Sequence, residues 1–261
     1  MTNYFEQTML NTARGITATA PAALYLALFL SDPTETGTAG TEVNYTGYVR
    51  QRLTLTTPTV DSENNSIVGT ANSADIIFPT PTAAAGTVTH AAIYDAATGG
   101  NMLVYKQLAQ SVVLNSETSP RFAAGELVLT MAYGNLHPDF KMKIFNWMRG
   151  TNISGFSPHL ALFNGDPVNA GAELSGTDYA RIPLVFDAPV EQPSGQMMSS
   201  NTNAAASPPA TSNWGTWAYG VIMTASTAGD KFFYKQNQGI YQMNNSAQVY
   251  VAAGAINIAL N

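Results

Sequence analysis

Short apolar stretches alternate with segments rich in Gly, Pro, Asn and Thr along the whole sequence. Residues 23–30 are a continuous apolar run of strand length, and residues 87–94 and 102–108 flank a turn-rich segment at 95–101. Residues 255–260 alternate along their length. Short strands separated by such turns are typical of antiparallel sheets packed face to face. The pattern predicts an all-β fold built from antiparallel β-sandwich domains.

Two segments have the period of a helix instead. Phe5 and Met9 share one face of the first segment, and Gly15 can end it. The second segment begins at Pro138 and ends at Gly150. Four apolar residues fall on one of its faces: Phe140, Ile144, Phe145 and Met148. Neither segment is long or basic enough to be a membrane anchor, so each is expected to be a short helix before a β body.

An internal repeat organises these elements. Residues 26–33 (LALFLSDP) recur 134 positions later as residues 160–167 (LALFNGDP). Further pairs keep the same order at separations that fall in steps from 135 to 129: 11–15 with 146–150, 48–50 with 179–181, 86–87 with 215–216, 105–107 with 234–236, and 123–125 with 252–254. Loop deletions after a tandem duplication produce such steps. We therefore expect two domains, 1–133 and 134–261, each a short helix followed by a β-sandwich, with a linker near 133–138.

One segment lacks the strand pattern. Residues 192–213 contain few apolar residues apart from Met197 and Met198, and they include Pro208 and Pro209. Proline is found essentially only at the edges and ends of strands. We expect a long loop here, with at most one edge strand.

Composition narrows the range of functions. Only 11% of the 261 residues are charged, against about 25% in an ordinary globular protein. The net charge is −6 and the 11 Lys and Arg residues are spread thinly, so there is no basic patch for wrapping nucleic acid. There is no Cys, and hence no disulfide or thiolate metal site. No apolar run approaches the length of a membrane span. We expect neither nucleic acid nor a membrane as a partner.

Catalytic motifs are missing. The sequence has no nucleophile elbow, no zinc-binding HExxH pair, no P-loop and no dinucleotide-binding fingerprint. His90 and His159 are replaced by Tyr219 and Tyr25 in the other copy, and His137 lies in the linker. The histidines are therefore poor catalytic or metal-binding candidates. We expect no catalytic, cofactor-binding or metal-binding residue and no enzymatic activity.

Acidic residues stand in two places where a site is conceivable. Asp61 and Glu63 lie in an oxygen-rich segment, but the Gly at the sixth position and the distal Glu of a calcium loop are absent, so a solvated hairpin loop is favoured. Asp32 and Asp166 precede Pro at the same place in both copies and are interpreted as turn residues. A calcium site and a catalytic carboxylate are the alternatives.

Two arginines occupy equivalent positions. Arg50 and Arg181 each stand among apolar residues. A buried Arg needs an ionic partner, and the repeated acids considered for this role are Asp32 and Asp166. We predict a structural ion pair within each copy. Exposure on a strand and binding of a ligand are the alternatives.

Aromatic residues distinguish the second copy. Trp214 and Trp217 stand where the first copy has Ala85 and Val88. Because the first copy lacks them, the fold does not require these indole rings. Packing in a core or an interface is favoured, and stacking on a carbohydrate is the alternative.

The first copy also carries a set of motifs that is specific in combination: 25–34 (YLALFLSDPT), 47–51 (GYVRQ), 86–90 (GTVTH) and 94–103 (YDAATGGNML). Together they resemble a family of small tailed-bacteriophage virion proteins whose members are commonly labelled "tail fibre protein". The resemblance covers residues 3–131, and the second copy joins it through the internal repeat. It implies a structural component of a bacteriophage virion in the baseplate, the fibre base or the fibre, which acts through contacts with other virion proteins.

Two other functional classes stay open: a capsid decoration protein and a carbohydrate-binding module. The first residues lack the basic region of a secretory signal. We therefore expect the protein to be made in the host cytoplasm and to reside in the virion.

The composition also bears on assembly. A weakly charged, apolar-rich surface tends to associate, and oligomers normally close under rotational symmetry. Three two-domain chains could form a ring of six similar domains, so we expect a homo-oligomer, with a trimer favoured. The contacts are expected at the helical segments or near residues 214–217. The alternative is a monomer bound to a major virion protein, with those aromatic residues in its own core.

Overall fold

The computed structural model describes residues 1–117, 119–132 and 134–260, which form two similar halves in series. The elements of the first half are α1 (Asn3–Leu10), η1 (Asn11–Arg14), β1 (Leu24–Phe29), β2 (Gln51–Leu53), β3 (Thr59–Val60), β4 (Val68–Ala71), β5 (Ile76–Ile77), β6 (Gly86–Tyr94), β7 (Met102–Leu114), β8 (Arg121–Phe122) and β9 (Val128–Met131). Those of the second half are α2 (Pro138–Met148), β10 (His159–Phe163), β11 (Ile182–Pro183), β12 (Val190–Glu191), β13 (Met197–Ser200), β14 (Ala205–Ala206), β15 (Gly215–Met223), β16 (Lys231–Met243), β17 (Tyr250–Val251) and β18 (Asn257–Ala259).

The two halves share one antiparallel topology. A four-stranded sheet has the order β2-β1-β6-β7 in the first half and β11-β10-β15-β16 in the second. Two smaller sheets accompany each, β3-β4-β9 and β5-β8 in the first half and β12-β13-β18 and β14-β17 in the second. The register repeats as well: Val88 pairs with Val112, Trp217 pairs with Tyr241, and the same irregularity follows each pair. The predicted all-β fold, in two tandem halves that each begin with a short helix, is confirmed.

Local signals begin and end the helices. The Thr2 hydroxyl caps α1 and the His137 imidazole caps α2, each by accepting a hydrogen bond from a backbone N–H group in the first turn. Gly15 (φ 79°) and Gly150 (φ 101°) stand after the helical segments in the left-handed conformation, as predicted. His137 is therefore a buried capping residue. The predicted linker begins at Tyr133, which lies outside the described residues, and the division into two domains stays a prediction.

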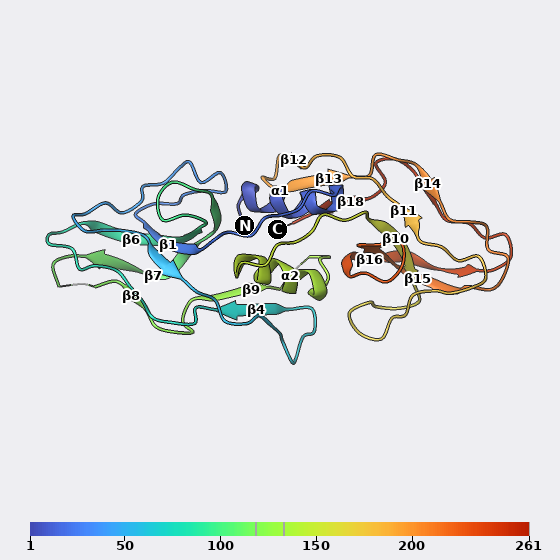
Figure 1. The fold of residues 1–261 in the computed structure, drawn as a ribbon, viewed down its shortest axis with the longest axis horizontal. Coiled ribbons are helices and arrows are strands. Elements are labelled where there is room, and N and C mark those ends of the chain that lie inside the picture. Colours follow the sequence, from blue (N-terminus) through green and yellow to red (C-terminus); the bar gives the residue numbers. More distant parts are fainter. Residues whose placement is uncertain (118, 133, 261) are drawn as a thin grey trace.

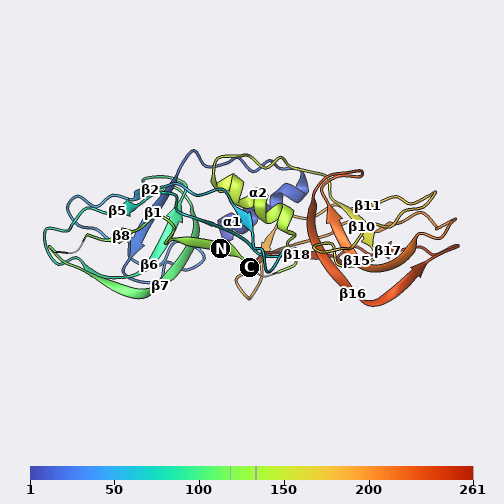
Figure 2. The ribbon, with the colours of Figure 1, turned by 90° about the horizontal axis from the view of Figure 1, so that it is seen from below.

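Both helices lie in the middle of the molecule, with a four-stranded sheet on either side (Figure 1). Helix α1 packs against β7 of its own half and against β13 and β18 of the other half. Helix α2 packs in the same way against β16 of its own half and against β3 and β4 of the first half. The view from below has the same central placement of the helices (Figure 2). Each helix thus bridges the halves and covers the three-stranded sheet of the other half.

One apolar core runs through this centre. It includes Phe5 and Met9 of α1, Trp147 of α2 and inward-facing residues of both four-stranded sheets. The rings of Phe5 and Trp147 lie 5.4 Å apart between centroids, so the two helices touch directly. The opposite face of each four-stranded sheet carries its own small cluster, with Phe29 in the first half and Phe163 in the second. Because buried apolar surface contributes about 25 cal/mol per Å², the shared core holds the two halves together.

The prediction of a long loop with at most one edge strand at residues 192–213 is wrong. Strand β13 lies in this segment and is the central strand of β12-β13-β18, while β14 pairs with β17. Met197 and Ser199 are the buried positions of β13. The Ser199 hydroxyl donates to the Asp187 carbonyl oxygen at 2.7 Å, so this polar group has a hydrogen-bond partner in the core. Because one of its two buried residues is a serine, β13 lacks the alternation of apolar and polar residues by which a strand is predicted.

Candidate interaction surfaces

The two halves cross each other directly after their helical segments. Ala18 and Ile153 form an isolated antiparallel bridge. The Ala18 N–H donates to the Ile153 carbonyl oxygen at 2.8 Å, and the Ile153 N–H donates to the Ala18 carbonyl oxygen at 3.1 Å. The two residues are equivalent positions of the repeat, 135 apart in sequence. Since a position pairs with its own counterpart, an approximate two-fold axis runs through this bridge.

The bonds beside the bridge obey the same symmetry. The Ala20 N–H donates to Asn152 Oδ1 at 2.8 Å, and its counterpart, the Gly155 N–H, donates to Thr17 Oγ1 at 3.3 Å. The room for a side chain differs between the two sites, because a Cβ added to Gly155 would lie 2.0 Å from the carbonyl carbon of Gly15. The crossing therefore requires glycine at position 155, although Ala20 carries a methyl group at the equivalent place.

Each helix also extends one buried charged side chain to the other half. Glu6 in α1 is 3% exposed, and its Oε2 accepts a hydrogen bond from the Met197 N–H at 2.9 Å. Lys141 in α2 is 0% exposed, and its Nζ donates to the Ser66 carbonyl oxygen at 2.6 Å. Burial raises the pKa of Glu6 and lowers the pKa of Lys141, because desolvation penalises both charged forms. Sequence reasoning missed both residues, and the only available signal was their equivalent placement in the repeat.

A charged network pins two loops of the first half to its four-stranded sheet. Arg50 binds Glu42 through two bonds, from Nε to Oε1 at 2.9 Å and from Nη2 to Oε2 at 2.8 Å, while its Nη1 donates to the Gly99 carbonyl oxygen at 2.7 Å. The Tyr48 hydroxyl donates to Glu42 at 3.1 Å and accepts from the Leu28 N–H at 3.0 Å. Burial raises the pKa of Tyr48.

The second half repeats this network. Arg181 binds Glu173 through bonds of 2.8 and 2.7 Å, and the Tyr179 hydroxyl donates to Glu173 at 2.9 Å. The predicted ion pair within each copy is confirmed, but the predicted partners are wrong. Asp32 and Asp166 instead accept backbone N–H bonds from two residues ahead, at 2.8 and 3.0 Å. These carboxylates are committed to their turns, as the proline context predicts.

Other candidate residues are dispersed. Asp61 Oδ1 accepts the backbone N–H groups of Glu63 and Asn64 at 2.8 and 2.9 Å, so its carboxylate holds its own loop. His90 lies in β6 and His159 in β10, in different halves. Within residues 1–117, 119–132 and 134–260, no three His, Cys, Asp or Glu side chains gather in a group that could hold a metal ion.

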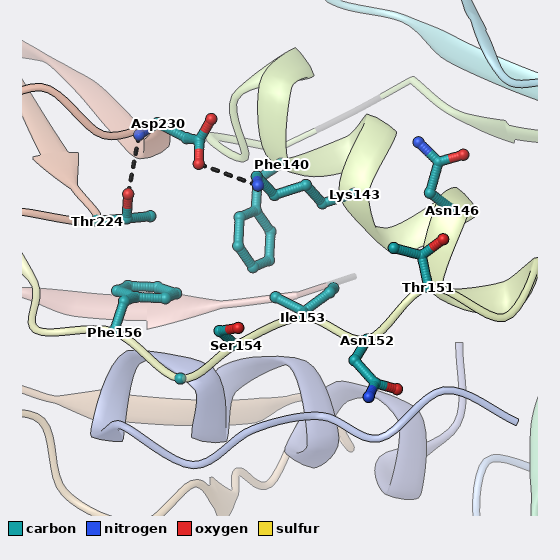
Figure 3. Close-up of a pocket in the computed structure, with 11 residues that line it drawn as sticks. Phe140, Lys143, Asn146, Thr151, Asn152, Ile153, Ser154, Phe156, Thr224 and Asp230 are labelled. Carbon is teal, nitrogen blue, oxygen red and sulfur yellow. Dashed lines mark hydrogen bonds and ion pairs between the residues drawn. The ribbon is translucent and has the colours of Figure 1, made fainter.

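An open groove of about 390 Å³ borders the crossing, between α2, residues 151–156 and the loop that joins β15 to β16 (Figure 3). Lys143 Nζ pairs with the Asp230 carboxylate at 3.1 Å, and the Asp230 N–H donates to Thr224 Oγ1 at 2.8 Å. Asn152 also lines the groove, and its side chain accepts the hydrogen bond from the Ala20 N–H at the crossing. The polar groups named here thus hold α2, the loop and the crossing in place.

Most of the aromatic residues that distinguish the second copy are internal. Trp147, which stands where the first copy has Thr12, is 2% exposed, and Trp214 is 3% exposed. The Trp214 ring lies edge-on to Tyr179 with centroids 5.3 Å apart. Trp214 is therefore a core residue of its own chain, and its burial excludes sugar stacking there. The apolar faces of both helices are likewise covered within the chain. The apolar faces of the helices and Trp214 thus form contacts within one chain, as the alternative of aromatic residues in the chain's own core predicts.

The outer part of β15 and β16 differs from its counterpart in the first half. Trp217 is half-buried and lies 5.6 Å from Tyr241 between ring centroids. Tyr241 is 51% exposed, and the adjacent Ile240 is 76% exposed. Val112 and Ser111 occupy the two equivalent positions of β7. Figure 2 shows β16 running outward, away from the central helices.

A duplicated β framework whose charged networks fasten its own loops is the architecture of a structural protein that works through its surfaces. The chain belongs to the family described as podophage GP4 fiber I protein gp80, whose family model matches residues 1–130 and 140–259. The two matched segments coincide with the two halves of the fold. No curated protein matches the chain. The resemblance noted in the sequence is therefore confirmed.

Family membership makes the chain a structural component of the virion, in the tail fibre, and not an enzyme. As a fibre protein it contacts other virion proteins. None of the helices in the described part of the chain is long and apolar enough to span a membrane.

Proposed function

We propose that the chain is a building block of the tail fibre that joins its neighbours through the outer ends of its two four-stranded sheets. The helices and the three-stranded sheets pack against each other in the centre, so the outer strands remain for contacts. Their backbones are alike, but Trp217, Ile240 and Tyr241 stand where the first half has Val88, Ser111 and Val112. This divergence on a common framework carries the proposal, because it gives one chain two different contact surfaces.

Residues 1–133 and 134–261 are the two domains in this proposal. Each contributes one four-stranded sheet, and both contribute to the central core. The duplicated register and the duplicated Arg–Glu–Tyr network support the division.

The proposed assembly is a homotrimer, in which three chains place six similar domains in a ring. Exposed aromatic and aliphatic side chains are enriched in the centres of protein interfaces, and Ile240 and Tyr241 are such residues. The chain is made in the host cytoplasm and assembles into the virion there.

The mass of the purified protein in solution, measured by light scattering, tests the oligomer. We expect a trimer for the wild type and a monomer for Ile240→Ser combined with Tyr241→Gln. Val128→Ser is the control, because Val128 is 61% exposed on β9, outside both four-stranded sheets, and this variant should stay trimeric. A wild type that is monomeric at every concentration, or a control that dissociates equally, would contradict the proposed trimer.

The position in the particle is a separate test. A map of the virion should place the chain in the tail fibre, with the outer end of β16 against a neighbouring subunit. Density on the capsid surface would instead favour the decoration protein, and a free β16 end with a bound glycan would favour the carbohydrate-binding module.

A further inference from the structure

The open groove beside the crossing is bordered by polar groups that the fold does not use (Figure 3). The side-chain hydroxyl groups of Thr151 and Ser154 bond to no other group within the described residues. Lys143 Nζ and the Asp230 carboxylate pair at 3.1 Å, but their side chains are 43% and 44% exposed. An ammonium and a carboxylate each form several hydrogen bonds, so both groups have positions left for a ligand. Two hydroxyl groups and one charged pair thus border the same open space.

The first half provides a matched comparison, because its equivalent residues do not leave such groups free. Thr8 stands where the second half has Lys143, and its hydroxyl donates to the Tyr4 carbonyl oxygen at 2.7 Å. Asn101 stands where the second half has Asp230, and its Nδ2 donates to a carboxylate of its own turn at 2.8 Å. A role in the framework would recur in both copies, as the Arg–Glu–Tyr network does. The unused polar groups therefore belong to the groove of the second half alone.

The same groove has a flat apolar surface. Phe156 is half-buried and stands where the first half has Pro21. Phe140 and Phe232 hold its ring in place, with centroids 5.9 and 5.0 Å away. The face of an aromatic ring carries partial negative charge and attracts C–H groups. A ligand in this groove can therefore place an apolar C–H face against Phe156 while its polar groups reach the hydroxyls and the charged pair.

The charge of the lining restricts the ligand further. Lys143 and Asp230 are the charged residues among those that line the groove, and their charges cancel, so the lining favours a ligand without net charge. The volume of about 390 Å³ lies in the range of roughly 300–1,000 Å³ that is usual for ligand sites. Many hydroxyl groups, an apolar C–H face and no net charge are combined in a neutral sugar ring.

We propose that this groove binds a neutral pyranose unit of a glycan. Thr151, Ser154 and the Lys143–Asp230 pair bond its hydroxyl groups, and Phe156 packs against its C–H face. The site lies between α2 and the loop that joins β15 to β16, apart from the outer end of β16, so it adds saccharide binding to the contacts with neighbouring subunits and does not depend on them.

Saturation-transfer NMR tests the site in the full-length protein, with millimolar glucose, galactose, mannose, rhamnose and N-acetylglucosamine as probes. We expect transfer to the ring protons of at least one of these sugars in the wild type. Thr151→Val combined with Ser154→Ala removes two hydroxyl groups that have no partner in the fold, so the variant should fold normally. The dissociation constant for that sugar should rise roughly tenfold, because two hydrogen bonds to the ligand are lost.

Two further variants locate the binding. Thr19→Ala is the matched control, because Thr19 is the exposed counterpart of Ser154 in the first half, and it should bind as the wild type does. Ile240→Ser combined with Tyr241→Gln should also leave the dissociation constant unchanged, whatever its effect on the oligomer. The proposal is overturned if none of the probes receives saturation from the wild type, if the double groove variant binds equally well, or if binding is lost with the β16 variant.

Discussion

The two halves of the molecule are most alike where side chains hold the halves' own loops, and they differ at the outer ends of the four-stranded sheets. Arg50 and Arg181 form the same bonds to a glutamate eight residues earlier, at distances that agree within 0.1 Å. Val88, by contrast, is replaced by Trp217 in the same register of the same strand pair. The loops must be held to the four-stranded sheet in both copies, so both copies keep the same Arg–Glu–Tyr network.

The centre of the molecule shows a second kind of difference. Glu6 and Lys141 are opposite in charge at one equivalent position, and Gly155 faces a backbone where its counterpart Ala20 has room for a methyl group. Identical copies can pack around a two-fold axis, so these differences are departures from the symmetry of the crossing. At Glu6, Lys141 and Gly155 the divergence falls on contacts between the two halves.

The largest expected effect comes from the asymmetry at the crossing. Gly155→Ala places a methyl group on the backbone of Gly15, and we expect a loss of about 4 kcal/mol in the free energy of unfolding, because main chain cannot yield as a side chain does. Ala20→Gly, the reciprocal change, should cost only about 1 kcal/mol. Denaturant titration of both variants measures this, and equal losses would mean that the crossing is looser than described.

Removing either arginine should come next. Arg50→Met leaves Glu42 partly buried without its partner, and Arg181→Met does the same to Glu173, so each should cost about 3 kcal/mol. The hydrogen bonds to the two glutamates are equivalent, but Arg50 also stacks on the Tyr94 ring, 3.5 Å from its centroid, so its loss should be the larger by no more than about 1 kcal/mol. Arg121→Met is the control, because its pair with Asp75 is exposed to solvent and should contribute little to stability. A difference of more than about 1 kcal/mol between the two buried sites would break the claim that both copies keep the same network.

Tyrosine variants test the same claim on a smaller scale. Tyr48→Phe removes the acceptor for the Leu28 N–H, and Tyr179→Phe removes the acceptor for the Leu162 N–H. Each should lower the free energy of unfolding by about 1–2 kcal/mol, the usual cost of a buried donor left without a partner. Equilibrium unfolding measures both, and a neutral result at one site only would show that the networks differ.

The smallest expected effect is one of pH. Burial, assisted by the charge of Glu35, raises the pKa of Glu6 above its ordinary value of 4.5, although its bond from Met197 and the N-terminal amine oppose this. A carboxyl group with a raised pKa in the folded state stabilises most below its unfolded pKa and loses that contribution as pH rises through the raised value. The stability of the wild type relative to Glu6→Gln should therefore fall as pH rises from below 4.5. Paired denaturant titrations across this range measure it, and a rise would mean that the bond from Met197 dominates.

Much of the framework could be predicted from the sequence, because it depends on local patterns. The apolar run that became β1, the prolines and glycines that bound the helices, and the Asp–Pro turns all act within a few residues. The partner of each arginine was missed, although Glu42 and Glu173 keep the same spacing to it in both copies. A search of the repeat for conserved acids, beyond those next to proline, would have found it.

The packing of each helix on the three-stranded sheet of the other half could not be predicted in this way. The apolar face of α1 indicates that the helix packs against something apolar, but either three-stranded sheet could cover it. The choice between the two sheets depends on contacts between residues far apart in sequence. Strand β13 was missed for a related reason, since Ser199 is buried through a hydrogen bond and not through apolarity. Charged and polar residues at buried positions carried the information that the hydrophobic pattern lacked.

The central claim, that the two halves of one chain cross at Ala18 and Ile153, has a direct test. Paired residues of this kind have Cα atoms about 5.5 Å apart, within the range of roughly 4.4–6.8 Å that a disulfide spans. Ala18→Cys combined with Ile153→Cys should therefore form a disulfide within the chain under mild oxidation, seen as a monomer that migrates faster on a non-reducing gel. Free thiols in the folded double variant, or links only between chains, would contradict the crossing.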